Sequence, residues 1–177
     1  SEEEITIDVG STFEIDINEN GTYRVVVIID GVEYEETFTV STIDSIAPSI
    51  TLSKTQGDWA TSHLVNITVT DLDSKVKAYY YAFTSNATET KELVIAQSEM
   101  YVGTTTAKLD SSYLNGAYYL HVYAIDNAGN AKLMSYGTYK LDYSAPVITS
   151  VELSETVDGW YHEAYKVVAV DVTENGS

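Results

Sequence analysis

Apolar and polar residues alternate along most of this chain, and this period of two is the feature that most restricts its fold. The stretch LVNITVT (residues 64–70) puts its branched apolar residues on one face and its polar residues on the other. In AYYLHVYAI (residues 117–125), Tyr118, Leu120, Val122 and Ala124 share a face, so His121 is expected on the opposite, exposed face. The pattern predicts an all-β fold of half-buried antiparallel strands. Only ATETKELVIAQ (residues 87–97) is ambiguous, between a helical turn and an irregular strand.

Several motifs occur twice, which indicates an internal repeat. IAPSIT around Pro48 returns as SAPVIT around Pro146, and these are the two prolines of the chain. GDW returns as DGW, NITVTDLD as VVAVDVTE, and NGTYRVVVIID as NGAYYLHVYAID. The period of about a hundred residues is the size of one β-sandwich domain.

The repeat predicts three segments. Residues 1–44 correspond to the C-terminal half of a module, with strands ITIDV, TFEIDI, TYRVVVII and YEETFTV. Residues 45–142 form a complete module, and residues 143–177 are the N-terminal part of a further one, with strands PVITSVEL and YKVVAVD. Neither fragment can bury its apolar face alone. Either the chain is an excerpt of a longer repeat protein, or chains complete each other's half modules head to tail by strand complementation, as a filament.

Three of these stretches resemble a known family. LDYSAPVIT (residues 141–149), the block from Trp59 to Val76 with VTDLDSKV, and NGAYYLHVYAIDNAGN (residues 115–130) are similar to the bacterial immunoglobulin-like repeats of large extracellular surface proteins, adhesins and secreted multimodular enzymes. The resemblance implies tandem immunoglobulin-like β-sandwich modules. It also implies that DNAGN is the corner between the last two strands of a module. Many functions use this fold, so the resemblance says little about activity.

Acidic loops are the candidate metal sites. DNAGN (residues 126–130) has oxygen ligands that suit calcium, but its spacing departs from the EF-hand pattern and its Asx and Gly residues are what a hairpin turn requires. We therefore favour the hairpin. Asp71 and Asp73, two residues apart, are a second candidate pair, joined by Asp126 or by Asp44 or Asp142 at a module junction. A solvated loop on an acidic surface is favoured there, so no metal site and no cofactor is assigned.

The motif NGxY occurs at Asn20 and at Asn115 and is interpreted as structural. A tight turn precedes the strand, and Tyr118 is expected to bond backbone upstream, as in the tyrosine corner of immunoglobulin-type sandwiches. Trp59 and Trp160 recur at matching points of two modules, so we favour packing over a sugar platform.

Catalysis finds no support in the sequence. The histidines His63, His121 and His162 are scattered, and no nucleophile-elbow, zinc-protease, P-loop or dinucleotide-binding motif occurs. An isopeptide bond between a lysine (Lys54, Lys75 or Lys77) and Asn127 or Asn130 has no diagnostic motif. Glycosylation sequons stand at Asn20, Asn66, Asn86 and Asn175.

Charge and composition restrict the partners. The chain has 27 Asp and Glu against 9 Lys and Arg, for a net charge of -18, which repels nucleic acid and anionic membranes. No apolar run is long enough for membrane insertion. The absence of cysteine excludes disulfides and thiolate sites, and 15 tyrosines against 3 phenylalanines suit an extracellular sheet protein.

The sequence therefore predicts a non-enzymatic stalk or spacer of an extracellular bacterial surface protein, with neighbouring modules as its partners. The alternatives are the filament subunit described above, which would form a homo-oligomeric head-to-tail fibre, and an accessory or carbohydrate-binding module of a secreted polysaccharide-degrading enzyme.

Overall fold

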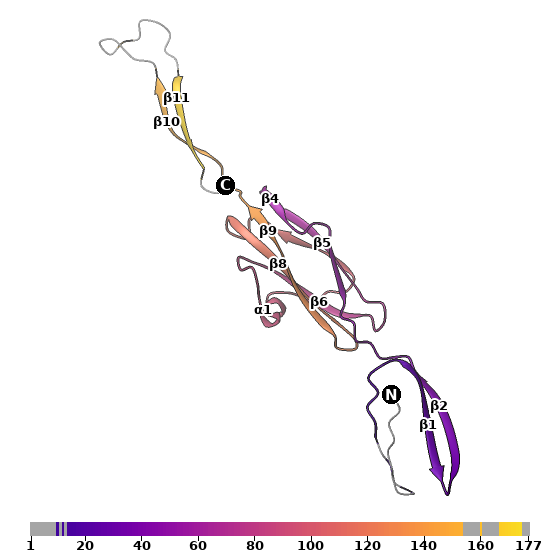
Figure 1. Cartoon of the computed structure of the whole chain (residues 1–177). Coiled ribbons are helices and arrows are strands. Elements are labelled where there is room, and N and C mark those ends of the chain that lie inside the picture. The colour runs from indigo at the N-terminus through magenta and orange to yellow at the C-terminus, as the bar shows by residue number, and fades with distance from the viewer. Residues whose placement is uncertain (1–9, 11, 13, 154–159, 161–166, 175–177) are drawn as a thin grey trace. The chain divides into compact units, whose positions relative to one another are not determined.

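The computed structural model describes residues 10, 12, 14–153, 160 and 167–174 (Figure 1). The protein is mostly β, with 58% strand and 4% helix, which confirms the all-β prediction. The chain divides into two compact units, residues 1–45 and 46–177, and each is taken by itself. No helix in the described part of the chain has the length and apolarity that crossing a membrane requires.

The second unit contains a domain of two sheets at residues 49–141, called here the two-sheet domain. One sheet has the order β3-β5-β7, and the other has the order β4-β9-β8-β6. All neighbours run antiparallel except β4 and β9, which are parallel. The strands are β3 Ser49–Leu52, β4 Gly57–Ala60, β5 His63–Thr70, β6 Val76–Thr84, β7 Thr104–Leu109, β8 Gly116–Asp126 and β9 Ala131–Leu141.

One apolar core lies between the two sheets. The alternation read from the sequence holds here, because Val65, Ile67 and Val69 of β5 have exposed fractions of 0%, 0% and 3%. Both sheets contribute to the same cluster, which burial of apolar surface stabilises. Its other members are Tyr79, Phe83, Ala107, Leu109, Leu120, Val122, Ala124, Tyr139 and Leu141.

A short helix, α1 (Lys91–Ala96), resolves the ambiguous stretch. Thr90 is its N-cap and accepts a hydrogen bond from the amide of Leu93 at 3.4 Å. The helix contacts β6 and β8, as Figure 1 shows beside these strands. Its fully buried Val94 lies outside the main core cluster, so α1 covers part of the outer face of the four-stranded sheet.

The first unit contains one described hairpin, β1 (Gly21–Ile29) and β2 (Val32–Val40). Its turn is Asp30-Gly31, with φ of 51° and 79°, the positive values that a two-residue hairpin turn requires. The predicted strand TFEIDI is wrong for its described residues, 12 and 14–17, which form no strand. The predicted strand ITIDV lies outside the described residues.

A second hairpin pairs β10 (Val147–Leu153) with β11 (Val167–Thr173) and agrees with the strands predicted there. Residues 165 and 166 of YKVVAVD lie outside the described part. Register shifts occur after Ile148 and after Glu152. Thr173 pairs with Val147, the residue after Pro146, just as Thr70 pairs with Ser49, the residue after Pro48.

Candidate functional site

The turn between β8 and β9 is held by Asp126. This fully buried carboxylate accepts hydrogen bonds from the Gly129 amide at 2.7 Å, the Asn130 amide at 2.8 Å and the Asn130 side chain at 2.9 Å. Gly129 has a φ of +98°, which suits glycine. Both oxygens of Asp126 are therefore used by its own turn, and the hairpin prediction is confirmed.

The structure brings some of the acidic candidate metal ligands close together and leaves others apart. Asp71 and Asp126 have carboxylate oxygens within 4.8 Å of each other, whereas Asp73 is exposed. Asp71 accepts the amide of Lys75 at 2.9 Å, which closes the turn between β5 and β6. Asp142 accepts the amide of Ser144 at 2.9 Å and therefore has a turn role of its own. Asp44 belongs to the first unit.

His121 is buried, with an exposed fraction of 0%, so its predicted exposure is wrong. The reason is the covering by α1, which the alternation of strand residues cannot show. Its Nε2 lies 3.0 Å from Thr84 Oγ1, and its Nδ1 lies 2.7 Å from Ser135 Oγ. Thr84 in turn donates to Glu89 Oε1 at 3.0 Å.

These contacts define the state of the ring. Because the Thr84 hydroxyl proton goes to Glu89, Nε2 of His121 carries the hydrogen and Nδ1 accepts from Ser135. Burial lowers the pKa of His121 from its ordinary 6.5, against opposing effects of Glu89 and of the Asn86 backbone. The pKa of Glu89 is lowered by its bonds from Asn86 and Thr84. The network joins the buried imidazole to Ser135 and to Thr84, and through Thr84 to Glu89.

The two NGxY motifs make the same hydrogen bonds in both units, and this set of contacts is called here the NGxY brace. Tyr118 donates its hydroxyl to the Leu114 carbonyl at 2.9 Å, as predicted, and Tyr23 does the same to the Glu19 carbonyl at 2.6 Å. The asparagine of each motif reaches the segment that follows the partner strand. Asn20 bonds the amide and carbonyl of Ile43, at 2.9 and 2.7 Å.

Asn115 makes the corresponding contacts in the second unit. Its Oδ1 accepts the Tyr143 amide at 3.2 Å, and its Nδ2 donates to Asp142 Oδ1 at 3.1 Å and to Ser144 Oγ. The turn before β8 is thereby tied to the chain that leaves β9. The two NGxY motifs therefore share their hydrogen bonding as well as their sequence.

Trp59, which was expected to pack, is 44% exposed on β4, and Lys140 Nζ lies 5.8 Å from its ring centroid. Trp160 is 80% exposed. Burial of the two tryptophans is therefore not observed. A single half-exposed ring beside a cation offers one contact for a planar ligand rather than a row of them.

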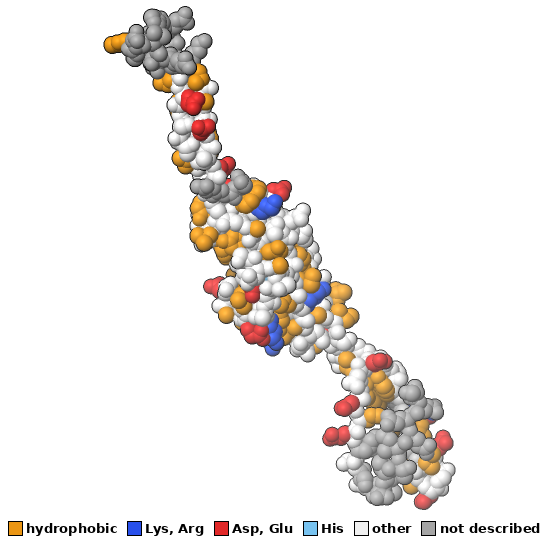
Figure 2. All heavy atoms as spheres, turned by 60° about the vertical axis from the view of Figure 1, so that its left-hand side comes forward, with side chains coloured by type: hydrophobic (Ala, Val, Ile, Leu, Met, Phe, Trp, Pro, Cys, Tyr) orange, Lys and Arg blue, Asp and Glu red, His pale blue; other side chains and the backbone are white. Residues whose placement is uncertain are grey.

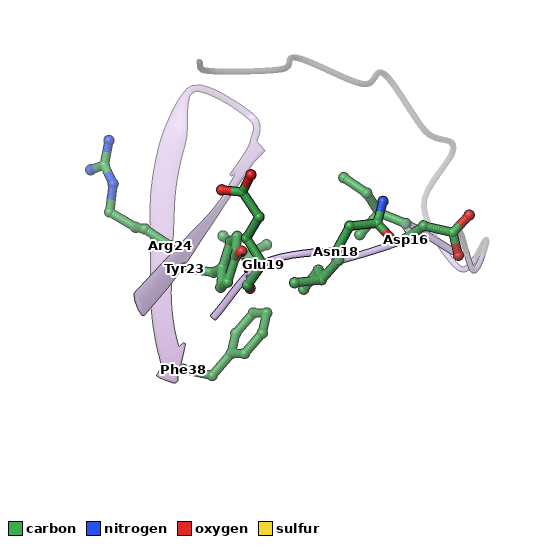
Figure 3. A pocket seen from close by; sticks show the side chains of 9 residues that line it. Asp16, Asn18, Glu19, Tyr23, Arg24 and Phe38 are labelled. Carbon is green, nitrogen blue, oxygen red and sulfur yellow. Dashed lines mark hydrogen bonds between the residues drawn. The ribbon is translucent and has the colours of Figure 1, made fainter. Parts of the chain in front are cut away.

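A shallow cavity of about 350 Å³ lies in the first unit. Figure 3 shows Tyr23 and Phe38 side by side on the hairpin, with the segment of Asp16, Asn18 and Glu19 beside them. The rings of Tyr23 and Phe38 stack at 5.8 Å between centroids. Residues 15–19 line this cavity together with Tyr23, Arg24, Val25 and Phe38.

The remaining candidates have local partners. Lys75 donates its ammonium to the Leu72 carbonyl at 2.6 Å, and Asn127 donates to the Ser74 carbonyl at 2.9 Å, so the two are used in turns rather than facing each other as an isopeptide pair. Lys54 Nζ lies 3.2 Å from Nδ1 of the buried His63. Asn66 accepts from Thr106 at 2.8 Å, whereas Asn175 lies outside the described residues.

Comparison of the chain with protein-family models, with curated proteins and with solved structures finds no match in any of the three.

Proposed function

We propose that this chain is a structural, non-catalytic segment of an extracellular bacterial surface protein or fibre, in which tandem immunoglobulin-like modules act as a stalk or spacer. The observation that carries the proposal is the repeated brace. Tyr23 and Tyr118 each bond the carbonyl four residues upstream, on strands that each pair antiparallel with the next strand. Two matching braces in one chain are what serial copies of one module would give.

The terminal strands of the two-sheet domain favour a mechanical role. β4, near the start of the domain, runs parallel to β9 at its end, with Gly57 opposite Tyr139 and Ala60 opposite Leu141. Pulling the chain at both ends draws parallel strands past each other along their axes. Their hydrogen bonds are then loaded together in shear rather than broken one by one. The Asp142 amide adds a bond to the Ala60 carbonyl at 3.0 Å.

The surface suits a spacer. Acidic side chains are scattered over the visible face in Figure 2, with few Lys or Arg among them. A net charge of -18 keeps such a chain soluble and discourages non-specific binding. The abundance of tyrosine supports the proposed extracellular location.

Single-molecule stretching of the whole chain between its two ends tests the mechanical role. The two-sheet domain should unfold in one cooperative step and release about 300 Å of chain, since residues 49–141 become extended. Extension without a resolvable force peak would contradict a load-bearing role. A force peak with a much smaller release would show that only a single hairpin opens.

The accessory carbohydrate-binding module remains a second candidate, because Trp59 is half exposed beside Lys140. Titration of soluble polysaccharides against tryptophan fluorescence separates the two functions. A saturable change that Trp59→Ala removes would favour the accessory module. The spacer proposal expects no saturable change with the original chain.

A further inference from the structure

We propose that Ser135 is a reactive nucleophile on the two-sheet domain and takes an acyl group from an activated ester. His121 acts as its general base, and Glu89 supports that base through Thr84. The inference goes beyond the proposed function and does not depend on it, because it concerns a covalent modification of the chain itself.

The hydroxyl of Ser135 lies at the surface, in front of a buried base. Ser135 on β9 is exposed and lies directly opposite His121 on β8, which has an exposed fraction of 0%. The distance between Ser135 Oγ and His121 Nδ1 is 2.7 Å. A hydroxyl within hydrogen-bond reach of a base, which a third group in turn orients, is the arrangement that activates a serine.

Thr84 and Glu89 supply that third group on the other side of the ring. His121 Nε2 lies 3.0 Å from Thr84 Oγ1, and Thr84 donates its own proton to Glu89 Oε1 at 3.0 Å. Nε2 therefore carries the ring hydrogen, and the lone pair of Nδ1 faces Ser135. Hydrogen bonds from Asn86 and Thr84 lower the pKa of Glu89, which favours its charged form. The four groups make one directed chain from hydroxyl to carboxylate.

The charges along this chain suit the loss of a proton from Ser135. Burial lowers the pKa of His121, so above pH 6.5 the imidazole is uncharged and can accept a proton. Once it accepts, the ring is a cation, and the charge of Glu89 favours that cation against the effect of burial. A carboxylate that stabilises the protonated base lowers the barrier to attack by the serine.

The edge of the sheet gives a carbonyl compound access to Ser135. β4 pairs with β9 at Tyr139 and Leu141, and in the described part of the chain only β8 pairs with β9 at Ser135. The helix α1 contacts β6 and β8 and leaves this edge open (Figure 1). Every second amide of an edge strand points away from its neighbour, so N–H donors for a carbonyl oxygen lie along the same edge.

The step is the transfer of an acyl group from an aryl ester to Ser135. A bond forms between Ser135 Oγ and the carbonyl carbon, and the bond between that carbon and the aryl oxygen breaks. The serine proton passes to Nδ1 of His121 and then to the phenolate. The products are an O-acylated serine and a phenol, so no oxidant or further reactant is needed.

Incubation of the whole chain with p-nitrophenyl acetate above pH 6.5, followed by mass spectrometry of its peptides, tests the inference. Ser112 is the internal control, because it is also exposed but donates its hydroxyl to the carboxylate of Asp110 rather than to an imidazole. Ser135 should be acetylated at least about a hundredfold faster than Ser112, since a positioned general base contributes that much. Ser135→Ala should remove the fast phase of nitrophenol release.

Variants of the supporting residues separate activation from mere exposure. His121→Gln removes the base and should slow acetylation of Ser135 at least about a hundredfold. Thr84→Val keeps the shape of the side chain but breaks the link to Glu89, and it should slow the reaction at least about tenfold. Thr84→Ser keeps the hydroxyl and should react at the original rate, so this pair tests the relay even if His121→Gln fails to fold.

Equal rates for Ser135 and Ser112 would overturn the inference, because exposure alone would then explain the labelling. Equal rates for Thr84→Val and Thr84→Ser would overturn the role of Thr84 and Glu89. A chain that fails both comparisons and still unfolds in one step under force would leave the proposed spacer function intact.

Discussion

Tyr118 and Tyr23 each close a short ring by bonding the carbonyl four residues upstream. The bond fixes the loop that leads into the strand, so the side chain acts on backbone rather than on a ligand. This explains why tyrosine rather than phenylalanine occupies both positions. The ring of Tyr118 packs against the core and that of Tyr23 stacks on Phe38, while each hydroxyl has a defined acceptor.

Tyr118→Phe should lower the stability of the two-sheet domain by about 1 kcal/mol, because the Leu114 carbonyl loses its partner and the ring remains. Amide hydrogen exchange along β8 measures the change. Tyr23→Phe is the matched control, since it removes the same bond from the first unit and should leave exchange in β8 as it was. Equal exchange in β8 for Tyr118→Phe and the original chain would show that the bond adds no stability.

His121 gives a pH dependence with a defined sign. Burial lowers its pKa below 6.5 in the folded state, so the unfolded chain binds its proton first as the pH falls. The stability contribution is complete above pH 6.5 and is lost as the pH falls from there through the lowered pKa. Unfolding by urea at a series of pH values should show a smaller loss for His121→Gln than for the original chain. Parallel curves would mean that the imidazole does not titrate differently on folding.

Single residues show where sequence reasoning reaches its limit. The alternation in β5 and β8 predicted the core positions correctly, since burial on one face of a strand follows a period of two. The alternation failed for His121 because a helix from a distant part of the sequence covers the outer face. The apolar run LVIA (residues 93–96), in which Val94 is fully buried, was a local signal of this covering.

Among the elements, β4 contains a glycine, Gly57, that lies against a buried ring. A Cβ at Gly57 would lie 2.5 Å from Cε1 and 2.7 Å from Nδ1 of His63, and that ring is buried with its Nε2 bonded to the Lys140 carbonyl at 2.8 Å. Because Gly57 has no side chain, β4 can pass close to the His63 ring and lie beside β9. The sequence shows GDW as a repeated motif, but it does not show that the glycine makes room for a ring.

Gly57→Ala should therefore separate β4 from β9 and lower the force at which the two-sheet domain unfolds. Asp58→Ala, on the same strand with an exposed side chain, is the control and should unfold at the original force. The comparison is made by stretching each chain in the same way. An unchanged force for Gly57→Ala would show that β4 does not carry the load.

The hairpins and their turns were the elements best predicted from sequence. DNAGN and Asp30-Gly31 have the residues that positive φ requires, and those residues are visible in the sequence. The short helix was left open because six residues give too little periodicity to distinguish it from a strand. Parallel pairing of β4 with β9 could not be predicted, since it joins residues that are far apart in the sequence.

For the whole molecule, the net charge of -18 opposes compaction. Raising the ionic strength with sodium chloride should raise the melting temperature, because salt screens repulsion between exposed carboxylates. Calcium and magnesium chloride at equal ionic strength should give the same increase, since both oxygens of Asp126 are already used by its turn. A rise specific to calcium would instead show that the neighbouring Asp71 and Asp126 bind the ion.

The asparagine braces also bear on chemical ageing. Asn20 and Asn115 are each followed by glycine, whose amide can attack the asparagine carboxamide without a side chain in the way. In the folded chain both carboxamides are held by hydrogen bonds to the segment after the partner strand. Deamidation of Asn115 would put a carboxylate beside that of Asp142 and turn an attraction into a repulsion. The hydrogen bonds of Asn115 would then be lost by deamidation rather than by mutation. Folding slows this loss because it restrains the carboxamide.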